Sequence, residues 1–170
     1  GRKIGLCWSS GIRTTINIWM EKYGRMKSMH FSNVLPMVGT RFDNRGFISL
    51  QVGDGREEIL GTIPDILSAN PNWDETAALI DNLDLVITVD TGVAHLAGAM
   101  GKPCWVMMQR DGASWHFMCY RPGASWNESS PWYPSIRLFR QHEFNQPGYW
   151  TDVVNDVVKA LQEPLQQAAE

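Results

Sequence analysis

Short apolar runs that alternate with segments of helical periodicity constrain the fold of this chain most strongly. Several of the runs are largely continuous rather than alternating, as in Leu-Val-Ile-Thr-Val before Asp90. Such runs are typical of strands that are covered on both faces of a sheet. We therefore expect strands over residues 3–8, 46–51, 63–67, 84–90, 103–108 and 136–139.

Helical patterns lie between these runs, most clearly over residues 74–83, 93–100 and 150–161. Strands that alternate with helices through short connections build right-handed crossovers and a mainly parallel sheet. The prediction is an α/β, doubly wound fold. With 170 residues, of which 44% are hydrophobic, one domain is expected over residues 1–162, with 163–170 as a helix end or tail.

Composition excludes several classes of protein. The net charge of −3 gives no overall basic surface for a nucleic acid, although residues 1–46 hold eight Lys and Arg against two acids. The longest apolar run, over 104–108, is far shorter than the ~18 residues of a membrane span. Three cysteines and no secretory leader favour a reducing, cytoplasmic setting.

Two stretches interrupt the alternation, over residues 11–30 and 109–135. Long loops in a compact domain are uncommon and are more often functional than not. We therefore expect the functional site near these two loops.

The turn after the fourth expected strand has the chemistry of an anion site. Asp90 and Thr91 end the strand, and either side chain could cap the following helix, leaving the amides of Gly92 and Val93 to face an anion. His95 lies one helical turn further and brings a titratable nitrogen toward the same region. The alternative is ordinary helix capping with a packed histidine.

A second candidate site follows the first strand, where Ser9, Ser10 and Gly11 supply hydroxyl and amide donors. Lys27 is expected to open the next helix, where its charge is unfavourable unless an anion binds, with Arg25 and Ser28 as secondary candidates. The alternative for this segment is a solvated basic loop.

Three further side chains are weaker candidates. Gln51, at the end of its strand, could bond a base edge or a ribose, although turn chemistry explains most of that segment. Trp115 in the long loop and Arg140 after the last strand could face the site. The other aromatic residues of the carboxyl-terminal third are expected to pack in the core.

Several nucleotide-binding signatures are missing from the sequence. Neither GxGxxG nor GxxxxGK[ST] occurs, which disfavours an oxidoreductase or methyltransferase of the Rossmann type and a P-loop hydrolase. The four histidines are scattered, and no CxxC, HExxH or DxD motif occurs. We therefore expect neither a metal nor a cofactor.

The order WSSG, RMKSM, SLQVGDGREEI, DETAALIDNLDLVITVDTGVAHLAGAMGKPCWVMM and SPWYPSIRLFRQ resembles the carboxyl-terminal domain of glycosyltransferase family 9, the ADP-heptose:lipopolysaccharide heptosyltransferases. It is closer to the related domain at the carboxyl end of bacterial tetratricopeptide-repeat proteins. The most specific part is D-T-G-x-x-H-x-A, formed here by Asp90, Thr91, Gly92, His95 and Ala97.

This resemblance implies half of a GT-B fold, in which two Rossmann-like domains face each other and the carboxyl-terminal one binds a nucleotide-sugar donor without a metal. It implies that residues 9–11 and Lys27 contact the diphosphate. Residues 90–92 would contact the phosphates or sugar beside His95, and Gln51 would lie near the nucleoside.

The resemblance also implies partners for this chain. In the family the catalytic base is an acid of the amino-terminal domain, so the expected partners are that domain, tetratricopeptide repeats and the donor. The full protein is expected to catalyse an inverting transfer. This half alone is expected to bind the donor without turnover. The alternative is a non-catalytic interaction module with a degenerate glycosyltransferase fold.

Overall fold

The computed structural model describes residues 1–11, 24–39, 46–110, 115–117, 130–142 and 150–163. Its centre is a five-stranded sheet in which every neighbouring pair of strands is parallel. This confirms the predicted α/β class with a doubly wound, Rossmann-like arrangement. The strands are β1 (Lys3–Cys7), β2 (Gly46–Ser49), β3 (Leu85–Val89), β4 (Cys104–Met108) and β5 (Ile136–Arg140).

The strand order β2-β1-β3-β4-β5 creates a switch point in the topology. The chain leaves β1 toward one side to form β2 and then crosses back to form β3 on the other side of β1. In open parallel sheets, ligands bind outside the carboxyl ends of the strands at such a point. A ligand site is therefore expected at the carboxyl ends of β1 and β3.

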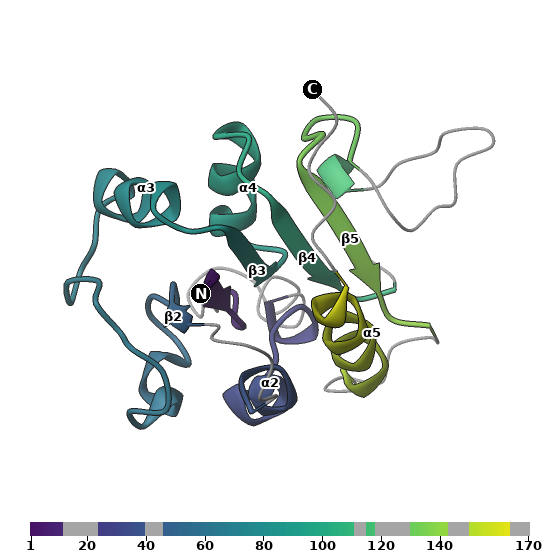
Figure 1. Cartoon of the computed structure of the whole chain (residues 1–170), viewed down its shortest axis with the longest axis horizontal. Coiled ribbons are helices and arrows are strands. Elements are labelled where there is room, and N and C mark those ends of the chain that lie inside the picture. Colours follow the sequence, from purple (N-terminus) through teal and green to yellow (C-terminus); the bar gives the residue numbers. More distant parts are fainter. Residues whose placement is uncertain (12–23, 40–45, 111–114, 118–129, 143–149, 164–170) are drawn as a thin grey trace.

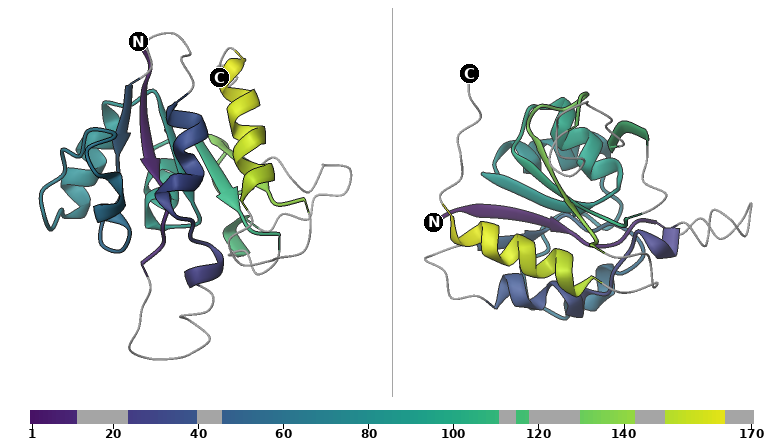
Figure 2. Two further views of the ribbon diagram at one scale, coloured as in Figure 1. Left: turned by 90° about the horizontal axis from the view of Figure 1, so that it is seen from below. Right: turned by 90° about the vertical axis from the view of Figure 1, so that its right-hand side faces the viewer.

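Helices cover both faces of the sheet (Figures 1 and 2). Helices α2 (Phe31–Val38) and α5 (Thr151–Gln162) pack together on one face, and α3 (Trp73–Asp81) and α4 (Gly92–Ala99) lie on the other. Alternate residues of each strand supply the two cores. In β3, Ile87 packs toward α2 and α5, whereas Val86 packs toward α3 and α4.

The expected strand over residues 63–67 is not present. These residues belong to an irregular connection between a 3-10 helix, η1 (Arg56–Ile59), and α3. Pro64 has no amide hydrogen to donate to a neighbouring strand, and its carbonyl accepts a single bond from the amide of Ser49 at 2.8 Å. Ile63 and Leu67 still enter the core, so the apolar pattern reflected burial rather than pairing.

The prediction that Lys27 opens a helix is also wrong. Residues 24–26 are helical and Lys27 lies in the turn that ends this segment. The next helix is α2, which the sequence analysis did not anticipate. His30 caps it by accepting a bond from Ser32, and Asn33 bonds the cap backbone in return, so a capping box begins this helix.

Several expectations fall partly outside the described residues. The long loops over 11–30 and 109–135 are described only at 24–30, 115–117 and 130–135, apart from their first residues, and 164–170 lie outside. Within 109–135 a short 3-10 helix, η2 (Trp115–Phe117), is present. Among the described residues, no helix combines the length and apolar character needed to cross a membrane.

Candidate functional site

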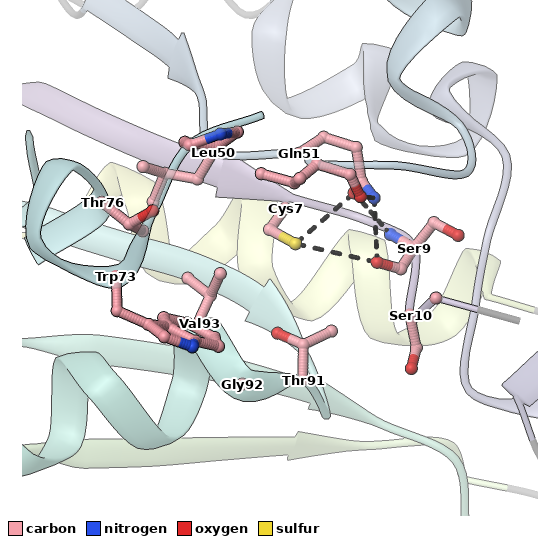
Figure 3. A pocket seen from close by; sticks show the side chains of 13 residues that line it. Cys7, Ser9, Ser10, Leu50, Gln51, Trp73, Thr76, Thr91, Gly92 and Val93 are labelled. Atoms are coloured by element: carbon pink, nitrogen blue, oxygen red, sulfur yellow. Dashed lines mark hydrogen bonds between the residues drawn. The ribbon is translucent and has the colours of Figure 1, made fainter. Parts of the chain in front are cut away.

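A cavity of about 230 Å³ lies at the carboxyl ends of β1 and β3, at the switch point of the sheet (Figure 3). Segments that follow β1, β2 and β3 meet there, together with the start of α3. The lining residues are Cys7, Ser9, Ser10, Gly11, Leu50, Gln51, Val52, Pro71, Trp73, Thr76, Thr91, Gly92 and Val93. Six of the predicted site residues are among them.

The turn after β3 presents backbone donors to this cavity. Thr91 is the extended residue before α4, with φ −140° and ψ 172°. Its hydroxyl lies 3.0 Å from the hydroxyl of Thr88, so Thr91, one of the two predicted caps, makes no side-chain capping bond. Among the described residues, no hydrogen-bond acceptor is found for the amides of Gly92 and Val93. These amides lie at the positive end of the α4 dipole, which favours an anion.

The turn after β1 is held by the side chain of Gln51, which is 1% exposed. Its Oε1 accepts bonds from the amides of Trp8 and Ser9 at 3.0 and 2.9 Å. Its Nε2 donates to the carbonyls of Ser9 and Asp54 at 3.0 and 2.9 Å. The side-chain amide of Gln51 is thus bonded to backbone groups on both sides and positions two loops.

Ser28 holds the same turn from the other side. The Ser10 amide donates to the Ser28 hydroxyl at 2.9 Å, and that hydroxyl donates to the Gly24 carbonyl at 2.7 Å. The amides of Ser9 and Ser10 are therefore both bonded within the chain. What these two residues can still offer a ligand is their hydroxyl groups.

Lys27 approaches the end of β3 although it is not part of the cavity lining. Its Nζ lies 3.9 Å from Oδ2 of Asp90, and the two side chains are 18% and 4% exposed. The ammonium group offsets the charge of the buried carboxylate immediately before Thr91. Arg25 is exposed and does not line the cavity.

His95 lies apart from the cavity, among aromatic side chains. Its Nδ1 is 3.1 Å from the hydroxyl of Tyr133, and its ring centroid lies 4.7 Å from that of His116 and 5.1 Å from that of Phe117. Burial lowers the pKa of His95, and the nearby His116 lowers it further. The residues of the D-T-G-x-x-H motif are thus divided between two environments.

The two remaining candidates are Arg140 and Trp115. The Arg140 guanidinium donates to the carbonyl of Phe117, and the residue does not line the cavity. Trp115 begins η2, but its side chain lies outside the described part of the structure.

Trp73 is a lining residue that the sequence analysis did not single out. Its side chain is 62% exposed, and a Cβ atom on Gly92 would lie only 2.6 Å from its Cη2. The absence of a side chain at Gly92 therefore makes room for the indole. The sequence holds one signal for Trp73: it is an aromatic residue at the start of the helix that precedes β3.

Two other chemistries find little support at the cavity. Burial raises the pKa of the Cys7 thiol to about 11, so this lining residue is protonated at neutral pH and is a poor nucleophile. Within the described ranges, no group of three or more His, Cys, Asp or Glu side chains could hold a metal ion.

Comparison with known proteins relates a segment of the chain to a glycosyltransferase family. Residues 58–105 match the family model of glycosyltransferase family 9 (heptosyltransferase). The chain is also 31% identical over 173 residues to Protein FlbA of Caulobacter vibrioides, covering 96% of this chain and 25% of that protein. The chain thus spans about a quarter of the length of this curated relative.

No solved structure matches the chain. The matched family segment includes α3, β3 and α4 and therefore one wall of the cavity, with Trp73, Thr91 and Gly92. On a Rossmann-like α/β fold, this chain thus has a segment similar to glycosyltransferase family 9 at the switch point.

Proposed function

We propose that this chain binds a nucleotide-sugar donor and is the donor-binding half of a metal-independent, inverting glycosyltransferase. One observation carries the proposal: a cavity at the β1/β3 switch point has Ser9, Ser10 and Gly11 on one side and Thr91 and Gly92 on the other. The similarity of residues 58–105 to glycosyltransferase family 9 supports a sugar nucleotide as the ligand.

The charges around the cavity suit the departure of a nucleoside diphosphate. When the bond to the sugar breaks, negative charge develops on the terminal phosphate oxygens, and fixed donors stabilise that charge without reorganisation. The Gly92 and Val93 amides and the dipole of α4 would provide such donors. The Lys27 ammonium lies 3.9 Å from the Asp90 carboxylate and offsets its charge, so the carboxylate repels the phosphates less.

We further infer that transfer requires segments outside this chain. FlbA is about four times as long as the stretch that this chain matches. An amino-terminal Rossmann-like domain would supply the base and the facing wall of the cleft, and tetratricopeptide repeats would belong to the same longer protein in the cytoplasm. The present chain would bind donor without turnover.

The test is titration calorimetry with ADP, UDP and GDP, and with the matching monophosphates as a comparison. Binding should be detectable for at least one diphosphate and should weaken in the Lys27→Ala chain. Thermal melting followed by circular dichroism serves as the control for folding.

Absence of heat with all of these nucleotides would overturn the proposal. It would favour a non-catalytic interaction module. The observation that favours that alternative is the internal bonding of the Ser9 and Ser10 amides, which removes two donors that a phosphate would otherwise use.

A further inference from the structure

The cavity has an apolar wall as well as a polar one, and Trp73 is its largest exposed apolar surface. Trp73 is 62% exposed and Val52, on the β2 side, is 39% exposed. Pro71 also lines the cavity. Figure 3 shows the Trp73 side chain at the start of α4, next to Gly92 and Val93. An indole is therefore open to solvent directly beside the donors proposed to bind phosphate.

The irregular segment that leads into α3, and so to Trp73, is fixed by an ordered set of polar contacts. Arg56 forms a salt bridge with Asp65 at 2.7 Å and donates to the carbonyls of Leu67 and Ser68 at 2.6 and 2.7 Å. The Ser68 amide and hydroxyl donate to Glu75 at 2.5 and 2.7 Å. These bonds join the connection after η1 to the first turn of α3.

The start of α3 is fixed in turn by Asn72, whose Oδ1 accepts a bond from the Glu75 amide at 2.8 Å. Trp73 is the next residue, so its backbone is held from both sides. A recognition surface that is rigid before binding loses little conformational entropy when the ligand arrives. The indole is exposed but its backbone is not free to move, which is the combination expected of a stacking platform.

We propose that Trp73 is the surface on which the nucleobase of the donor stacks, with the phosphates at the start of α4. This inference rests on the proposed function and adds the orientation of the ligand: base toward Trp73, Val52 and Pro71, phosphates toward Ser10 and Gly92. Stacking tolerates different bases, because every base has a π face. Trp73 would thus contribute affinity for the base, and the polar groups would make binding depend on the phosphates of the ligand.

Gly92 belongs to the same arrangement. Any side chain at this position meets Trp73, with 2.6 Å between an added Cβ and Cη2. Because Gly92 has no side chain, its amide stays accessible to a phosphate and the Trp73 indole can lie against the start of the helix.

The experiment compares Trp73→Ala, Trp73→Phe and Trp132→Ala chains. Trp132 is a matched control, because it is 57% exposed and is not a lining residue. Each chain is titrated with ADP, UDP and GDP and, separately, with inorganic pyrophosphate, which has no base. Thermal melting confirms that each variant is folded.

We expect Trp73→Ala to weaken nucleotide binding by roughly 10-fold, within the range measured when a stacking aromatic is removed. Pyrophosphate affinity should be unchanged, and Trp73→Phe should recover most of the nucleotide affinity. Trp132→Ala should bind like the unmodified chain. Nucleotide should also quench tryptophan fluorescence in the unmodified chain and do so much less in Trp73→Phe.

Two outcomes would overturn the inference and they differ from each other. If Trp73→Ala binds nucleotide as tightly as the unmodified chain, the stacking role is wrong while donor binding stands. If the unmodified chain binds neither nucleotide nor pyrophosphate, the proposed function fails and the inference fails with it.

Discussion

The two strand ends that meet at the cavity differ in how their backbone amides are used. After β1, the amides of Trp8 and Ser9 donate to Gln51, and the amide of Ser10 donates to Ser28. After β3, the amides of Gly92 and Val93 have no acceptor among the described residues. Both turns follow buried strands and both were predicted to bind phosphate.

The chain's own side chains hold the first turn in shape, whereas the amides of the second turn are the ones that the proposed ligand would use. A buried amide that lacks an acceptor costs about 1–3 kcal/mol, so side chains satisfy the amides that no ligand reaches. Gly92, at the start of α4, is exposed, so water or an anion can occupy the place of an acceptor there. Phosphate contacts are therefore expected mainly at the β3 side, with the Ser9 and Ser10 hydroxyls as the contribution of the other side.

The largest expected effect concerns the β1 side. Replacement of Gln51 by Leu keeps the size but leaves several buried backbone groups without partners, so the free energy of unfolding should fall by about 3 kcal/mol. Urea denaturation measures this. The neighbouring Val52→Ala, at an exposed position, is the control and should change stability much less. A Gln51→Leu chain as stable as the original would contradict the assignment of this side to structure.

The next effect concerns the β3 side and should appear in binding rather than in stability. In Gly92→Ala the new methyl group displaces Trp73, so we expect nucleotide affinity to fall about tenfold while the melting temperature changes little. Gly46→Ala is the control, because no atom of the described residues lies within 4 Å of its added Cβ.

The same variant sharpens the comparison when it is combined with Trp73→Ala. If the methyl group acts by displacing the indole, the double variant should bind about as weakly as Trp73→Ala alone. Fully additive losses would show that Gly92 and Trp73 act independently.

A smaller effect is expected for Lys27→Ala. The ammonium group lies at the edge of the site, 3.9 Å from Asp90, and a charge interaction at this degree of exposure contributes about 1 kcal/mol, or roughly fivefold in affinity. Calorimetry at two salt concentrations should show both weaker diphosphate binding and a smaller dependence on salt. Lys27→Arg, which keeps the charge, should bind nearly as well as the original; equal losses in both variants would argue against a charge effect.

The smallest effect concerns His95, which lies outside the cavity. The pKa of His95 is lowered in the folded state. Below about pH 6.5 the unfolded chain therefore binds more protons than the folded chain, and the free energy of unfolding decreases as the pH is lowered. His95→Gln should lose less stability than the original chain between pH 7 and pH 5.5. Thermal melts across that range measure it, and identical pH profiles would contradict the environment described for His95.

The sequence predicted the strands of the sheet well, because the apolar pattern that indicates a strand lies within the residues of that strand. Continuous apolar runs located β1, β2, β3, β4 and β5 within about two residues at each end. The same signal failed at residues 63–67, because burial of Ile63 and Leu67 does not require pairing when Pro64 interrupts the donors. Periodicity reports which face is buried, and it cannot report whether a neighbouring strand is present.

The cavity was only partly predictable. Thr91 and Gly92 could be found from the strand, turn and helix pattern, and both line the cavity. The engagement of Gln51 could not, because its partners are backbone groups 42 and 43 residues away. Nor could the position of Trp73 beside Gly92, which depends on how the start of α3 lies against α4 after both have packed on the sheet.

Backbone amide chemical shifts measured during a titration with pyrophosphate would test the central claim most directly. The amides of Gly92 and Val93 should show the largest changes, and those of Trp8 and Ser9, which are bonded to Gln51, should change little. Largest changes at the β1 turn, or no changes at either turn, would contradict the claim that the start of α4 is the anion-binding side of this cavity.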